Sequence, residues 1–390
     1  IGRIAFDGCT SLESITIPES VTEIGYCAFD GCTSLESITI PESVKKIAEL
    51  SLVGCTSLES IVVADGNPVY DSREGCNAII ETATNTLIKG CKTTVIPESV
   101  KEIGSCAFWD CTSLENITIP EGVMEIGGHA FRGCTSLESI IIPESVKKIV
   151  IYTFRDCTSL KSIIIPESVT KIDCCVFEGC TSLESIVVAD GNPVYDSREG
   201  CNAIIETTTN TLIQGCKTTV IPESVTEIGY AAFIRCTSLK SITIPNSVTE
   251  IVSEAFKGCT SLKSITIPNS VTKIGSYVFE GCTSLKSITI PESVTEIGNC
   301  AFYRCTSLES VVIPKGVRKI EERAFAGCTS LTTLTLPTGV NKIEEQVFDK
   351  CSALATINVP AKKTDYYKQR LPEELHDKIV ELAPEKKTKK

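Results

Sequence analysis

Apolar and polar residues alternate in short runs along this chain, and proline and glycine separate the runs. In the segment LESITIP, which begins at Leu12, two isoleucines alternate with serine and threonine. Alternation with a period of two, built on β-branched residues, predicts a short strand. Pro18 has no N–H group and ends that strand. Residues 21–24 predict a second short extended segment, and Gly31 lets the chain turn back.

The same pattern recurs every 23 residues, which is the period of the cysteines from Cys9 to Cys55 and in two later series. All 12 phenylalanines lie at one repeat position, where Leu52 is the clear substitution, and 13 of the 17 prolines share the position of Pro18. A fixed period in this range indicates a stacked repeat protein. Identical side chains then pack coil on coil. We therefore expect about fifteen coils, with neighbouring strands paired in parallel about 4.8 Å apart.

Two coils are longer than the others. They comprise residues 63–91 and 188–216, which differ at two places and lie 125 residues apart. Apolar runs at residues 78–80 and 86–88 flank the polar segment 82–85, and this pattern predicts a β-hairpin. We expect a hairpin to project from the stack of coils in each long coil.

The C-terminal segment has a different composition. Residues 1–360 are predicted to form the solenoid, and residues 361–390 a helical cap followed by an exposed basic tail. Such a cap shields the core of the last coil from water. The predicted helical face consists of four aliphatic residues: Leu371, Leu375, Ile379 and Leu382.

The bulk composition excludes two kinds of partner. A net charge of -12 argues against binding to a nucleic-acid backbone. No run of 18 apolar residues occurs, so we expect no insertion into a membrane. The chain opens at Ile1 in the second half of a repeat, so we expect a fragment or a processed form.

The 22 cysteines are interpreted as small buried apolar groups. Equivalent cysteines on neighbouring coils have parallel Cα–Cβ bonds about 4.8 Å apart, whereas a disulfide needs Cβ atoms about 3.8 Å apart on converging bonds. A zinc site needs four ligands around one point, and we expect none. The alternative is a disulfide across each hairpin, and the candidate pairs are Cys76 with Cys91 and Cys201 with Cys216.

No pattern of catalytic residues is visible. His129 and His376 are the two histidines, and neither lies beside a nucleophile motif. An enzyme needs unique residues at one site, whereas these coils repeat one another. We therefore expect no catalytic residue, no cofactor and no metal. A Ca²⁺ site made of oxygen ligands is an alternative to a simple turn in the first long coil, and its candidate ligands are Asp65, Asn67, Asp71 and Glu74.

The outward strand positions define a candidate binding face. Reading down the column of Glu13, the charge is negative at most coils and positive at three successive coils of the second half. These three coils form the basic strip, which consists of Lys240, Ser241, Thr243, Lys263, Ser264, Thr266, Lys286, Ser287 and Thr289. One interpretation is a solvated edge whose charges changed as repeats were duplicated. The other is a docking face for an acidic partner.

The strand motif Leu-x-x-Ile-x-Ile, followed by Pro-x-Ser-Val-x-x-Ile-Gly-x-x-Ala-Phe-x-x-Cys, resembles the BspA-like, or treponemal-type, leucine-rich repeat family of bacterial surface proteins. The resemblance covers residues 1 to about 360. It implies an α/β-type solenoid, a curved right-handed leucine-rich repeat superhelix. It also implies location on the cell surface or secretion, and adhesion to host matrix proteins or other microbes, without common catalytic residues.

Two functions are therefore expected from different classes. The first is a non-catalytic adhesion scaffold that binds an extracellular matrix protein or a microbial surface protein. The second is a carbohydrate-binding or carbohydrate-acting surface protein, which needs exposed aromatic platforms such as Trp109, Tyr230, Tyr277 and Tyr303. A cytoplasmic location is the alternative to the cell surface, because many free cysteines are expected.

Overall fold

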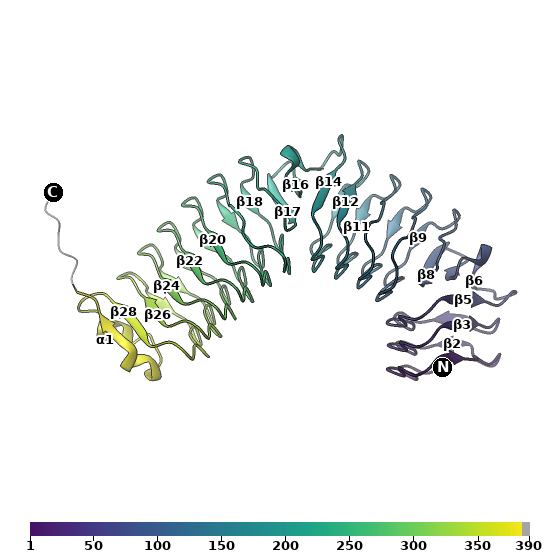
Figure 1. The fold of residues 1–390 in the computed structure, drawn as a ribbon, viewed down its shortest axis with the longest axis horizontal. Helices are drawn as coiled ribbons and strands as arrows, with labels where there is room; N and C mark the ends of the chain where they lie inside the picture. The colour runs from purple at the N-terminus through teal and green to yellow at the C-terminus, as the bar shows by residue number, and fades with distance from the viewer. Residues whose placement is uncertain (384–390) are drawn as a thin grey trace. The chain divides into compact units, whose positions relative to one another are not determined.

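The computed structural model of the protein describes residues 1–383. The chain forms two compact units, Ile1–Asp196 and Ser197–Lys390. Both are built of the same kind of coil, and the strands of successive coils lie side by side within each unit (Figure 1). About 16 turns are present in the described residues, against the fifteen expected.

In the first unit, one strand ladder follows the LESITIP segments. It is made of two separate sheets, one of β1 (Ser14–Ile15), β3 (Ser37–Ile40) and β5 (Ser60–Val63), and one of β12 (Ser162–Ile165) and β14 (Ser185–Val188). The pairing is parallel and in repeat register, with Ile38 opposite Ile61. Along β3 the exposed and buried side chains alternate, with Ile38 and Ile40 inside. The predicted strand and its inward face are confirmed.

A second ladder of two-residue strands follows in each regular coil. In the first unit it contains β2 (Glu23–Ile24), β4 (Lys46–Ile47), β9 (Glu102–Ile103), β10 (Glu125–Ile126), β11 (Lys148–Ile149) and β13 (Lys171–Ile172). These strands also pair in parallel, and their isoleucines face the core while Glu or Lys lies outside.

The long coils are part of this second ladder. The first contains β6 (Tyr70–Asp71), the 3-10 helix η1 (Arg73–Gly75), β7 (Ala78–Glu81) and β8 (Thr86–Gly90). Strands β7 and β8 pair antiparallel, and β8 then pairs in parallel with β9. The prediction that the hairpin projects from the stack is therefore wrong. The physical reason is that Ile79, Ile80 and Leu87 are fully buried, and a projecting hairpin would expose them.

The second unit repeats this arrangement. Its second ladder contains β16 (Ala203–Glu206), β17 (Thr211–Gly215), β18 (Glu227–Ile228), β19 (Glu250–Ile251), β21 (Lys273–Ile274), β23 (Glu296–Ile297), β25 (Lys319–Ile320) and β27 (Lys342–Ile343). Its first ladder contains β20 (Ser264–Thr266), β22 (Ser287–Thr289), β24 (Ser310–Val312), β26 (Thr333–Thr335), β28 (Thr356–Val359) and β29 (Ile379–Glu381). The remaining short elements are β15 (Tyr195–Asp196) of the first unit and η2 (Arg198–Gly200) of the second.

The C-terminal segment departs from the expected single helical face. It forms α1 (Thr364–Lys368) and the 3-10 helix η3 (Glu373–Lys378), and then β29, which pairs in parallel with β28. Leu371 and Leu375 are buried, whereas Ile379 belongs to the strand and Leu382 is exposed. The single helix predicted through Leu382 is therefore wrong, because the open edge of β28 provides backbone partners that a helix cannot use. Most of the predicted basic tail, residues 384–390, lies outside the described residues.

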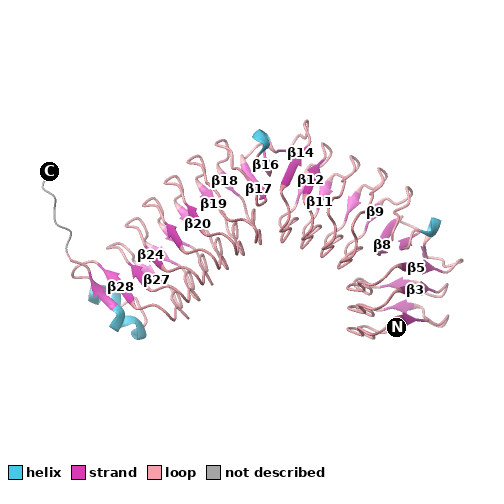
Figure 2. Cartoon of the chain, in the orientation of Figure 1, coloured by secondary structure: helices cyan, strands magenta, loops and turns pink. Residues whose placement is uncertain are grey.

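Turns, rather than helices, complete each regular coil (Figure 2). Within residues 1–383 the helices are α1, η1, η2 and η3, so the α/β character expected of the solenoid is limited. No helix in this part of the chain is long and apolar enough to cross a membrane.

Two side-chain ladders fill the core behind the strands. Phenylalanine rings stack with nearly parallel planes, and the ring centroids of Phe302 and Phe325 are 5.0 Å apart. Each such stack adds about 0.5–1.5 kcal/mol to the effect of burial. Beside the rings, register cysteines donate a hydrogen bond to the carbonyl of a phenylalanine 26 residues earlier, as Cys282 Sγ does to Phe256 O at 3.2 Å. The coil-on-coil packing predicted from the repeat is confirmed.

Candidate binding surface

The basic strip lies entirely in the second unit, and all nine of its side chains are exposed. Ser264 and Thr266 belong to β20 and pair directly with Ser287 and Thr289 of β22. Thr243 on the preceding coil forms a parallel bridge with Thr266. The structure thus brings the predicted residues together on one face.

The three lysines of the strip stand on adjacent coils. The backbone N–H of Lys263 donates to the carbonyl of Lys240 at 3.2 Å, and that of Lys286 donates to the carbonyl of Lys263 at 3.3 Å. None of these three ammonium groups forms an ion pair with another described residue. By contrast, Lys161 of the same column pairs with Glu138 at 2.7 Å in the first unit. The lysines of the strip are therefore available to an external anion.

Shallow polar depressions lie beside this column in both units, with opposite charge. In the second unit the depression is lined by Lys217, Thr218, Ser238, Lys240, Ser241 and Ser261. In the first unit the equivalent depression is lined by Glu115, Asn116, Ser136, Glu138 and Ser159. The same repeat position therefore presents cations in one unit and carboxylates in the other.

Sequence reasoning missed an apolar strip on the strand face of the first unit. It consists of Ile141, Ile164 and Val187, which are 81%, 61% and 42% exposed. Ile164 and Val187 are paired directly across β12 and β14. The signal was present in the sequence, because the runs IIIP and IVVA break the alternation seen in SITIP. Exposed β-branched residues in a row are unusual on a solvated surface.

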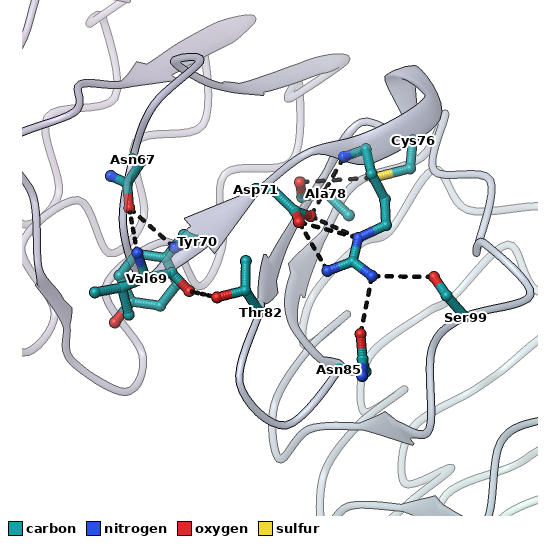
Figure 3. Close-up of polar contacts among 10 residues, drawn as sticks. Asn67, Val69, Tyr70, Asp71, Cys76, Ala78, Thr82, Asn85 and Ser99 are labelled. Carbon is teal, nitrogen blue, oxygen red and sulfur yellow. Dashed lines mark hydrogen bonds and ion pairs between the residues drawn. The ribbon is translucent and has the colours of Figure 1, made fainter.

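The first long coil contains the candidate Ca²⁺ ligands, but Asn67 acts as the centre of a turn (Figure 3). Its Oδ1 accepts hydrogen bonds from the backbone N–H groups of Val69 at 3.0 Å and Tyr70 at 2.9 Å. Its Nδ2 donates to the carbonyls of Pro41 at 2.8 Å and Val44 at 2.9 Å. These four bonds use the whole amide and tie the long coil to the coil before it.

Asp71 is also engaged within the protein. Its carboxylate pairs with Arg73, whose Nη2 lies 2.7 Å from Asp71 Oδ2. The same guanidinium donates to Asn85 Oδ1 at 2.8 Å and Ser99 Oγ at 3.2 Å, partners that Figure 3 places on the following segments. Within residues 1–383 no group of three or more His, Cys, Asp or Glu side chains is placed to hold a metal. The turn interpretation agrees with this geometry.

The two histidines have structural partners. His129 stacks on Trp109, with ring centroids 5.1 Å apart, and its other neighbour is Tyr152 at 5.0 Å. Burial, together with the nearby guanidinium groups, lowers the pKa of His129. His376 Nε2 shares a hydrogen bond with the carbonyl of Leu371 at 3.0 Å. Neither ring is held beside a nucleophile by these contacts.

All 22 cysteines are free thiols, including the two candidate pairs Cys76 with Cys91 and Cys201 with Cys216. Most are buried, as predicted. Burial raises the pKa of Cys55 to about 12 and that of Cys282 to about 12. A thiol with so high a pKa stays protonated and reacts slowly at neutral pH.

Comparison with known proteins identifies the repeat. The family model of the BspA type leucine-rich repeat region matches residues 1–74, 85–197, 212–315 and 249–371. No curated protein matches the chain in sequence.

Several solved structures have the same fold. A leucine-rich repeat protein of Bacteroides ovatus ATCC 8483 is 31% identical over 93% of this chain and 88% of that chain, with a TM-score of 0.55. A leucine-rich cell surface protein of Faecalibacterium prausnitzii A2-165 is 26% identical over 93% of this chain and 89% of that chain, with a TM-score of 0.55. A leucine-rich repeat protein of Eubacterium ventriosum ATCC 27560 is similar in fold, with 24% identity over 86% and 76% of the two chains and a TM-score of 0.52. The chain therefore belongs to the BspA type leucine-rich repeat family.

Proposed function

We propose that the protein is a non-catalytic adhesion scaffold that binds an acidic face of a partner protein through its basic strip. The observation that carries this proposal is the row of Lys240, Lys263 and Lys286 on adjacent coils, exposed and without an ion-pair partner among the described residues. The partner is an extracellular matrix protein or a surface protein of another microbe.

Electrostatics favours an acidic partner for this row. Lysines on neighbouring strands are about 4.8 Å apart along the ladder and repel one another modestly. Carboxylates of a partner relieve this repulsion and attract the strip over a distance of about 8–10 Å at physiological salt. Such attraction mainly raises the association rate and makes it dependent on salt.

The carbohydrate alternative has weaker support. Sugar rings need flat aromatic platforms, whereas the strand face carries serine, threonine and lysine in the second unit and aliphatic residues in the first. Trp109 lies at a turn, where Arg132 already covers its ring at 4.4 Å from the centroid. The exposed Ile141 and Ile164 suit contact with protein rather than with sugar hydroxyl groups.

Location on the cell surface or secretion forms part of the proposal. One structural relative is described as a cell surface protein. The number of cysteines does not oppose an oxidising compartment, because burial raises the pKa of thiols such as Cys236 to about 12 and keeps them unreactive.

The test is binding to immobilised matrix proteins, such as fibronectin and fibrinogen, at low and at physiological salt. One variant replaces Lys240, Lys263 and Lys286 with glutamate. The matched control replaces three exposed lysines outside the strip with glutamate, namely Lys350, Lys362 and Lys368. We expect salt-sensitive binding that falls at least tenfold in the strip variant and stays within twofold in the control. Equal losses in both variants would show that net charge alone is responsible, and binding to neither protein would reject adhesion to these matrix proteins.

A further inference from the structure

The two long coils can be compared residue by residue. They differ at two positions, and at one of these the side chain is buried in both coils. Lys89 of the first corresponds to Gln214 of the second, 125 residues later. Both side chains are buried, with 7% and 6% of their surface exposed. The amide of Gln214 donates to the carbonyl of Gly215 at 2.9 Å and to that of Ala232 at 3.3 Å. The buried polar group of the second unit is thus satisfied.

Lys89 has no such partner. No hydrogen bond or ion pair joins its ammonium group to another residue in the part of the chain that the structure describes. Asp30 and Asp110 are near enough for Lys89 to act on their pKa values, lowering them, but neither carboxylate contacts its ammonium group. The first long coil therefore presents a cation to a cavity at the position where the second long coil has a hydrogen-bonded amide.

Lys89 lines a cavity of about 300 Å³ that lies wholly within the first unit. The space lies where the phenylalanine ladder of the first unit is interrupted, because Leu52 and Ile88 stand three residues before their cysteines, where regular coils have a ring. The residue equivalent to Leu52 in the second half of the sequence is Phe177. Leu52 lies on the coil that precedes the first long coil, and Lys89 lies on the first long coil itself. The smaller side chain and the lysine therefore line the same cavity.

The wall of the cavity changes in character with depth. Lys89 is buried, Glu81 and Glu102 are half-buried, and Glu49 is exposed. Thr84 donates to Glu81 Oε2 at 2.6 Å, and Thr86 donates to Glu102 Oε2 at 3.4 Å, so both carboxylates are held in place. The apolar part of the wall is mainly aliphatic, with Tyr70 as its one aromatic ring, and its aliphatic members are Ile47, Leu50, Leu52, Val53 and Ile88.

From this arrangement we infer that the cavity binds a small aliphatic α-amino acid. Its carboxylate pairs with Lys89 at the floor, its ammonium group lies among Glu49, Glu81 and Glu102 at the mouth, and its side chain contacts the aliphatic wall. A simple anion does not fit, because the three carboxylates outnumber the one lysine and repel it on entry. A simple cation leaves Lys89 unpaired. The volume suits a ligand at the small end of the usual range for binding pockets.

L-Leucine is the probe, and 4-methylpentanoate and 3-methylbutylamine are its analogues without the ammonium and without the carboxylate, respectively. Binding to the full chain is measured by titration calorimetry and by the shift in thermal midpoint. We expect saturable binding of leucine, and at least tenfold weaker binding of each analogue. Lys89→Gln, which copies the second long coil, should weaken leucine binding at least tenfold, and Leu52→Phe should abolish it by filling the cavity. Lys101→Gln, which changes an exposed lysine of the next coil, is the matched control and should bind leucine as the parent does.

Three results would overturn the proposal. They are no binding of leucine to the parent protein at millimolar concentration, equal binding of leucine to Lys89→Gln, and binding of 4-methylpentanoate as tight as that of leucine. The comparison of the three probes uses the unaltered protein, so it decides the question even where a variant fails to fold. The site lies in the first unit and the basic strip in the second, so failure of either proposal leaves the other standing.

Discussion

At the scale of single residues, two positions in each regular coil hold the backbone in the left-handed region. One is the residue before each register cysteine, which is glycine in most coils, as at Gly31 with φ of 67° and Gly327 with φ of 74°. The other lies five residues before the cysteine, where Cys27, Tyr152 and many others take positive φ. The first position is where the chain turns towards the strand, and glycine adopts that conformation at little cost.

Lys350 occupies the first of these positions with φ of 56°, and its side chain is exposed. We expect Lys350→Gly to stabilise the protein by about 0.5–1 kcal/mol, because it removes the strain of a left-handed non-glycine residue. Gly327→Ala is the opposite change in the preceding coil and should cost about 1 kcal/mol or more. Equilibrium unfolding in guanidinium chloride measures both. A pair of changes with the same sign would contradict this account.

Comparing the repeats of this sequence with one another singles out two residues that line the cavity, but it does not show that they lie close together. Lys89 and Gln214 stand out as one of only two differences between the long coils, and Leu52 stands out from 12 phenylalanines. Their proximity could not be predicted, because it depends on how the longer coil turns back onto the coil before it. The same limit explains why Asp71 looked like a metal ligand, since its partner Arg73 was not expected to fold onto it.

At the scale of one coil, the phenylalanine ladder joins each turn to its neighbours. Phe279 lies between two rings, at 5.7 Å from Phe256 and 5.3 Å from Phe302. Phe6 stacks on Phe29 alone at 5.2 Å and is only half-buried. Since coils stabilise each other through nearest neighbours, a residue with two partners contributes more.

We therefore expect Phe279→Ala to lower the free energy of unfolding by about 3–5 kcal/mol. Phe6→Ala, the same substitution at a half-buried ring, should cost roughly 1 kcal/mol because less surface leaves water. Denaturant titration followed by circular dichroism gives both values. Similar losses at the two positions would show that stability does not depend on stacking along the ladder.

The repeat made the regular coils predictable, because each position of the motif is confirmed many times over. Because the motif repeats, the residues equivalent to Ile38 and Ile40 are expected to face inward in all the regular coils alike. The long coils and the C-terminal segment have no such redundancy. The alternation in residues 78–88 predicts two paired strands, but the parallel pairing of Thr86 with Glu102 depends on the close fit of Gly90 against the ring of Phe108. Ile379 likewise joins a strand because β28 offers an open edge.

The candidate binding surface was predictable to the same extent. Alternation placed Lys240, Ser264 and Thr289 outside, and the structure agrees. The apolar strip was missed because Ile141 and Ile164 belong to uniformly apolar runs, in which neither face can be assigned from the pattern alone. The basic strip and the apolar strip are both exposed, so a binding measurement is needed to tell which of them contacts a partner.

At the scale of the whole molecule, the many buried thiols link folding to pH. Burial raises the pKa of Cys55, Cys236 and Cys282 from the ordinary value of 9.0 to about 12. Above pH 9 the unfolded chain loses these protons while the folded chain keeps them. The contribution of each thiol to stability is therefore complete below pH 9 and is lost as the pH rises towards 12. The loss is about 1.4 kcal/mol per pH unit for each thiol.

We expect the protein to lose stability steeply between pH 9 and pH 10, and the slope to depend on the number of buried thiols. Replacing Cys55, Cys236 and Cys282 with alanine should make the slope shallower by about 4 kcal/mol per pH unit. The same variant should be less stable at pH 7, by about 1 kcal/mol for each lost hydrogen bond of an S–H group. Guanidinium titrations at pH 7, 8, 9 and 10, with a phosphine reductant present, measure the free energy of unfolding in each case.

Lysine and tyrosine also titrate in this range, so the comparison needs a control variant that keeps all the lysines and tyrosines of the parent protein and loses only thiols. Cys9 and Cys174 are exposed, and their replacement with alanine removes two thiols that the fold leaves in water. This variant should follow the slope of the parent protein, because it leaves every buried thiol in place. Parallel slopes for all three proteins would mean that the buried thiols ionise without unfolding. The interpretation of the cysteine ladder as part of the apolar core would then be wrong.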